Sequence, residues 1–134
     1  MMIQKKILLA DDDKDDRYMF DYFFDELSND FMKLESVENG AELIDFLNKI
    51  GDDHLLPQLI VLDQNMPKMS GTQTLSFLKS SERYKNIPVI IYSTHNDHAF
   101  TKDCTELGAS LIISKPDSYD GYKAMIQTFL QNLY

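Results

Sequence analysis

The chain has 134 residues, a length that suits one domain with its own buried core. Acidic residues outnumber basic ones by 22 to 13, giving a formal net charge of −9. Such a surface repels phosphate backbones, and no apolar run approaches the roughly 20 residues that span a bilayer. We therefore expect neither direct nucleic-acid binding nor a membrane segment. The lone Cys104 and the short apolar run near the start, too short for a signal peptide, favour a cytoplasmic location.

Five short apolar runs punctuate the chain. Near-continuous runs of this kind are typical of strands that are buried on both faces, as in a parallel sheet covered by helices on each side. In chain order, the expected strands cover residues 7–10, 34–37, 59–62, 89–92 and 111–113.

Between these runs, apolar residues recur every three or four positions, which is the pattern of helices packed on a core. The spacing predicts helices over about residues 15–28 and 72–81, two more near 43–50 and 122–133, and one that ends at Gly108 as its C-cap. Five strand–helix repeats predict a doubly wound parallel α/β sheet with right-handed crossovers. We see no linker or repeat, so residues 1–134 are expected to form a single domain without an output domain.

Polar residues follow four of the five expected strands, and ligands bind beyond the carboxyl ends of parallel strands. We therefore expect these side chains to converge on one crevice. Packed carboxylates raise one another's pKa unless a cation intervenes, and Mg²⁺ is a hard ion that suits oxygen ligands. A carboxylate beside the ion can attack a phosphoryl group, while an ammonium and a hydroxyl hold the transferred oxygens. The residues concerned are Asp11, Asp12, Asp63, Asn65, Ser93 and Lys115.

Taken in order, four segments resemble a response-regulator receiver domain of a two-component phosphorelay, and in particular a stand-alone one. The segments are residues 7–12, 59–71, 87–93 and 108–116. The resemblance covers essentially the whole chain. It implies a flavodoxin-like strand order, 2-1-3-4-5, in three α/β/α layers.

The resemblance also implies roles for the acidic residues. Asp63 would accept a phosphoryl group from a histidine of a sensor kinase or of a phosphotransfer protein. Asp12 would bind Mg²⁺ directly, Asp11 mostly through bound water, and Asn65 through its backbone carbonyl. The protein would then be a signalling switch with at most slow self-dephosphorylation, and not an enzyme in the metabolic sense.

On the other side of the crevice, Ser93 would hydrogen-bond to the phosphoryl group and Lys115 would pair with it. The resemblance implies a cis bond between Lys115 and Pro116, which would aim the ammonium back into the crevice. Ile112 stands where the family often places a switching aromatic residue. We therefore expect output through the apolar edge strand 111–113 and its neighbouring helices, which would dock a second copy or a downstream effector.

Three alternatives remain at this point. A binding module of the same fold would never be phosphorylated. A haloacid-dehalogenase-like phosphatase would carry a second Asp two residues after its nucleophile, where this chain has Asn65. A flavodoxin would carry a Ser-, Thr- and Gly-rich loop after the first strand, where this chain has a run of Asp residues.

Further acids, Asp13, Asp15 and Asp16, begin the first helix. Carboxylates there favour the positive end of the helix dipole, so we interpret them as capping residues, with a recognition edge as the alternative.

Four other side chains carry separate predictions. Tyr18 and Tyr22 lie off the apolar stripe of the first helix, which makes them candidate partner contacts. His95 and His98 are joined by no Cys or third His, so we expect no transition-metal site there.

Overall fold

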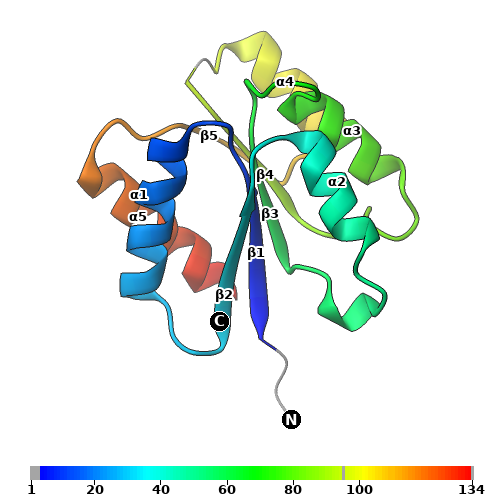
Figure 1. Ribbon diagram of the computed structural model, residues 1–134. Helices are drawn as coiled ribbons and strands as arrows, with labels where there is room; N and C mark the ends of the chain where they lie inside the picture. The colour runs from blue at the N-terminus through cyan, green and yellow to red at the C-terminus, as the bar shows by residue number, and fades with distance from the viewer. Residues whose placement is uncertain (1–3, 95, 134) are drawn as a thin grey trace.

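Five parallel strands form one sheet in the order β2-β1-β3-β4-β5 in the computed structural model (Figure 1). The structure describes residues 4–94 and 96–133. The predicted doubly wound α/β sheet with its flavodoxin-like order is confirmed. The elements are β1 (Lys5–Ala10), α1 (Lys14–Leu27), β2 (Met32–Val37), α2 (Gly40–Asn48), a 3₁₀ turn (Asp53–Leu55), β3 (Leu59–Asp63), α3 (Gly71–Ser80), β4 (Val89–Ser93), α4 (His98–Leu107), β5 (Leu111–Ser114) and α5 (Tyr119–Leu133).

Alternate side chains of each strand enter two cores, one on each face of the sheet. Ile7 and Leu9 of β1 pack with α1 and α5, while Leu8 and Ala10 pack with α2, α3 and α4. Figure 1 shows the same division, with α1 and α5 on one face and α2, α3 and α4 on the other. Because both faces are covered, β3 and β4 are buried along their whole length, which explains their continuous apolar runs.

Polar side chains set where several helices begin. Asp13 accepts hydrogen bonds from the first turn of α1, and Ser70 forms a reciprocal capping box with Gln73 at the start of α3. At the other end of α4, Gly108 adopts a left-handed conformation with φ of 106°, so the predicted C-cap is confirmed.

The two edge strands differ from their sequence-based predictions in detail. β2 begins at Met32, before the predicted start at residue 34, because its first residues alternate and do not form an apolar run. β5 is an edge strand as predicted, but it extends one residue further, to Ser114. Within it, Leu111 is 41% exposed, whereas Ile112 is half-buried against the core.

The loop between α2 and β3 is tied down at the edge of the sheet where the strands begin. Arg83 donates to the Asp53 carboxylate at 2.7 Å and to the backbone carbonyl of Ile50. We call these contacts the Arg83 anchor. Among the described helices, none has the length and apolar character that a membrane crossing requires.

Candidate functional site

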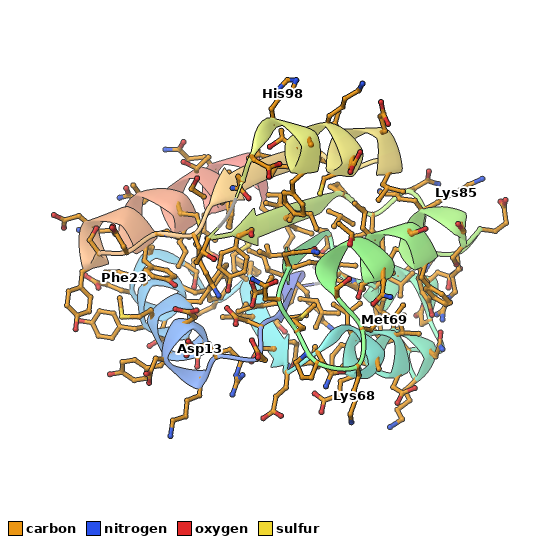
Figure 2. All side chains as sticks on the ribbon, turned by 90° about the horizontal axis from the view of Figure 1, so that it is seen from above. Asp13, Phe23, Lys68, Met69, Lys85 and His98 are labelled. Atoms are coloured by element: carbon orange, nitrogen blue, oxygen red, sulfur yellow. The ribbon has the colours of Figure 1, made fainter. Side chains whose placement is uncertain are left out.

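The loop that follows β1 and the end of β3 bring an acidic cluster together at the carboxyl edge of the sheet. Asp11 and Asp12 follow β1, and Asp63 is the last residue of β3. Carboxylate oxygens of these three residues lie within 4.8 Å of one another. Figure 2 shows this edge from above, with Asp13 on the α1 side and Lys68 and Met69 in the loop after β3.

Lys115, just after β5, places its ammonium among three carboxylates. Its Nζ lies 2.6 Å from Asp16 Oδ2, 3.2 Å from Asp11 Oδ2 and 3.4 Å from Asp63 Oδ2. The Lys115 side chain is only 9% exposed. An ammonium has three N–H donors, so it can serve all three acids at once.

The backbone of Lys115 is fixed by β4. Its N–H donates to the carbonyl of Ser93 at 2.9 Å, and Ser93 pairs with Ser114 in the sheet register. Ser93 itself is buried. The Lys115–Pro116 bond is trans, so the predicted cis bond is wrong. Trans is favoured by about 0.5–1 kcal/mol at X–Pro bonds, and the long lysine side chain reaches Asp63 without a cis turn.

Asp11 is fully buried and held from two sides. One oxygen accepts the backbone N–H of Asp13 at 2.9 Å, and the other accepts the hydroxyl of Tyr92 on β4. Burial and the Asp11 charge raise the pKa of Tyr92 well above its ordinary value, so the phenol stays protonated and remains a donor.

The electrostatics of the cluster centre on Asp63. Burial raises the pKa of Asp63 to about 7, and the Asp11 charge adds to the rise while Lys115 opposes it. Burial also disfavours the charged form of Lys115, but Asp16, Asp11 and Asp63 outweigh burial and raise the pKa of the ammonium. Negative charge therefore exceeds what Lys115 neutralises, and an added cation would relieve the excess.

A tight loop leads from Asp63 to α3. A Cβ atom at Gly71 would lie 2.6 Å from the carbonyl oxygen of Asp63, so the chain passes too close for any side chain. Gln64 closes the loop by accepting the backbone N–H of Thr72 at 2.9 Å. The loop turns at Lys68, whose φ is 66°. Asn65, predicted to offer its carbonyl, lies in this loop with an exposed side chain.

Tyr92 and Asp16 are two site residues that the sequence reasoning missed. Tyr92 ends an apolar run, and that run predicts only a buried strand. Asp16 is one of three acids predicted to cap α1, but Asp13 is the residue that makes the capping hydrogen bonds. The available signal was helical spacing, because Asp16 lies four residues before Phe20 and shares its buried side of α1.

Several other predictions can be placed. Tyr18 and Tyr22 are 66% and 53% exposed, as expected for side chains off the apolar stripe. Cys104 is fully buried and packs in the core between the sheet and α2, α3 and α4. His95 lies outside the described residues, so the structure does not address its pairing with His98.

Comparison with known proteins gives a family. Residues 7–127 match the response regulator receiver domain family. The chain belongs to that family. It is 31% identical over 119 residues to the two-component response regulator ARR3 of Arabidopsis thaliana, covering 84% of this chain and 50% of the relative. It is 28% identical over 124 residues to the response regulator Rre1 of Synechocystis, covering 92% and 51%. The chain thus spans about half the length of these curated relatives.

Solved receivers have the same architecture. The Mn²⁺-bound form of response regulator Rcp1 is 27% identical with a TM-score of 0.81, covering 93% of this chain and 91% of that one. The phosphorylated cyanobacterial phytochrome response regulator RcpA is 27% identical with a TM-score of 0.82, covering 96% of each chain.

Receiver domains of two-component systems are signalling switches that are phosphorylated on an aspartate. They interact with histidine kinases or phosphotransfer proteins. Membership of this family decides against the phosphatase and flavodoxin alternatives.

Proposed function

We propose that this receiver accepts a phosphoryl group on Asp63 from a histidine of a sensor kinase or of a phosphotransfer protein. The observation that carries the proposal is the setting of Asp63. It ends β3 as a buried carboxylate, with Lys115 Nζ at 3.4 Å and the carboxylates of Asp11 and Asp12 beside it. That residues 1–134 act without an output domain stays a prediction.

In the transfer step, a carboxylate oxygen of Asp63 attacks phosphorus while the bond from phosphorus to the donor's imidazole nitrogen breaks. The electron pair of that bond stays on the nitrogen, and an acyl phosphate forms on Asp63. Lys115 is close enough to pair with the transferred oxygens, and the hydroxyl of Ser93 would donate to them. In self-dephosphorylation, water attacks phosphorus and Asp63 leaves as a carboxylate, releasing phosphate.

The donor set fits Mg²⁺, because carboxylate and carbonyl oxygens are the ligands that this ion takes in proteins. Asp11, Asp12, Asp63 and the backbone carbonyl of Asn65 would hold it. When bound, Mg²⁺ would supply positive charge that offsets both the carboxylates and the transferred oxygens. The raised pKa of Asp63 supports this assignment, since burial and the Asp11 charge disfavour its ionised form and a bound cation would stabilise that form.

The test of the acceptor is phosphoryl incorporation measured by intact mass, with Mg²⁺ and acetyl phosphate as donor. Asp63→Asn keeps the side-chain volume and removes the nucleophile, so incorporation should be lost completely. Asp15→Asn makes the same charge change at an exposed position and should keep it. Incorporation that survives in Asp63→Asn contradicts the acceptor. No incorporation in the wild type favours the alternative of a binding module that is never phosphorylated.

We propose that the signal is passed on when a second copy or an effector docks on the face formed by α4, β5 and α5. A groove of about 490 Å³ lies between β5 and α5, lined in part by Leu111, Ile113 and Met125. Because Ile112 packs against the core, Leu111→Asp is the sharper test. It should weaken phosphorylation-dependent association in sedimentation experiments. A wild type that stays monomeric with and without acetyl phosphate excludes the second copy and leaves the effector.

A further inference from the structure

Asp16 gives Lys115 a third carboxylate to bind, outside the acidic cluster of Asp11, Asp12 and Asp63. Lys115 Nζ is 2.6 Å from Asp16 Oδ2 but 3.4 Å from Asp63 Oδ2. Of the three carboxylates around the ammonium, Asp16 therefore makes the shortest contact. Ion pairs of this length are charge-assisted hydrogen bonds, stronger than the longer contact to Asp63.

A third element holds Asp16 in place. Its other oxygen, Oδ1, accepts the hydroxyl of Tyr122 on α5 at 2.8 Å. Tyr122 is buried, so its phenol is fixed by the core of the α1–α5 layer. Both oxygens of Asp16 are thus engaged, one by α5 and one by the residue that follows β5.

Phosphorylation would change what Lys115 faces. A phosphoryl group brings about −1.5 to −2 charges and three acceptor oxygens, and these would draw the ammonium towards Asp63. Asp16 competes for the same ammonium from the α1 side. The position of Lys115 then depends on which of the two anionic groups binds it more strongly.

We propose that Asp16 is a positioning residue that restrains Lys115 on the α1 side and so slows phosphoryl transfer to Asp63. This inference rests on the proposed function and names a determinant of its rate. When Lys115 moves to the phosphoryl group, Asp16 keeps its bond to Tyr122 but loses the ammonium, so the link from α1 and α5 to the residue after β5 breaks. The state of Asp63 is thereby reported to α5 without an aromatic residue at position 112.

The experiment measures the initial rate of Asp63 phosphorylation by acetyl phosphate at saturating Mg²⁺. Asp16→Asn should be faster than wild type by about fivefold, the rate change that corresponds to a partly exposed ion pair. Asp15→Asn is the matched control, because it removes one charge from the same helix turn at an exposed side chain. The rate of Asp15→Asn shows how much acceleration comes from weaker repulsion of the anionic acetyl phosphate alone.

Two further variants separate restraint from structural damage. Asp16→Glu keeps the charge and should restore most of the slow rate. Tyr122→Phe keeps every charge but frees Asp16 Oδ1, and it should accelerate the reaction less than Asp16→Asn. Partial unfolding lowers a rate, so acceleration cannot come from misfolding. Should Asp16→Asn fail to fold, Tyr122→Phe carries the test.

A double-mutant cycle with Lys115→Met tests whether Asp16 acts through Lys115. In the Lys115→Met background, Asp16→Asn should change the rate no more than Asp15→Asn does. An undiminished acceleration there overturns the inference, as does an Asp16→Asn protein that is no faster than Asp15→Asn. These results leave the proposed function standing. A wild type that incorporates no phosphoryl group overturns the proposed function, and this inference with it.

Discussion

A cation lies at each end of the sheet, Lys115 at the carboxyl end and Arg83 at the amino end, and the two have different surroundings. At the carboxyl end, Lys115 faces the carboxylates of Asp11, Asp16 and Asp63. At the amino end, Arg83 faces one carboxylate, which is 72% exposed, together with backbone carbonyls and a tyrosine hydroxyl.

The difference lies in how the charges balance. Two backbone carbonyls and a tyrosine hydroxyl accept from Arg83 without bringing negative charge, so the Arg83 anchor is complete as folded. Lys115 leaves a buried excess of negative charge, and such an excess costs free energy unless a further cation binds. A site with unbalanced charge can respond to a ligand, whereas a balanced one can only hold a loop in place.

The largest expected effect is on the rate of Asp63 phosphorylation, which should depend on Lys115 and not on Arg83. Lys115→Met should slow phosphorylation of Asp63 by about a hundredfold, the loss seen when one stabilising donor to a developing charge is removed. Arg83→Met should leave that rate unchanged but lower the free energy of unfolding by about 2 kcal/mol, because it strands the carbonyl of Ile50. Initial rates and urea denaturation of both variants measure this. An equal loss of phosphorylation rate in the two variants would contradict this prediction.

Next in size is the effect of Mg²⁺ on stability. At a hundredfold excess over its dissociation constant, an ion that binds only the native state stabilises it by about 2.7 kcal/mol. Asp12→Ala should abolish this gain, whereas Asp53→Ala at the Arg83 anchor should keep it. Thermal melts with Mg²⁺ or EDTA give the answer. An equal gain in wild type and Asp12→Ala would mean that the ion binds elsewhere.

The smallest effect concerns pH. The pKa of Asp63 is about 7 in the folded protein against an ordinary 3.8, so the native state holds a proton that the unfolded state has lost. Metal-free stability should therefore fall as pH rises from about 4 through about 7, by on the order of 2 kcal/mol between pH 5 and pH 8. Asp63→Asn removes this dependence. Urea denaturation of both proteins in EDTA at the two pH values measures it, and parallel curves would refute it.

Much of the fold could be predicted because its signals are local. Strands covered on both faces, such as β3 and β4, leave continuous apolar runs, and Gly108 marks a helix end through its left-handed backbone. The strand order came from the resemblance to receivers, since no local pattern states which strand lies beside which.

The site was harder to predict from the sequence, because several of its contacts join side chains from different helices and strands. Asp16 meets Lys115 and Tyr122 only after α1, β5 and α5 have packed. Likewise Tyr92 is an ordinary core aromatic until its hydroxyl meets Asp11 across the sheet. The bond before Pro116 was predicted as cis from the resemblance to receivers, whereas it is trans, the form that X–Pro bonds intrinsically prefer.

The backbone hydrogen bond from Lys115 to Ser93 has a consequence for how receivers of this kind can diverge or be re-engineered. Through the pairing of β4 with β5, this bond fixes the separation of Lys115 and Ser93, the two residues proposed to bind the phosphoryl group. Loop length does not set that separation. Segments beyond Thr94 and beyond Pro116 can therefore lengthen, shorten or be exchanged between homologues to change partners. The separation of Lys115 and Ser93 stays the same, because the sheet sets it.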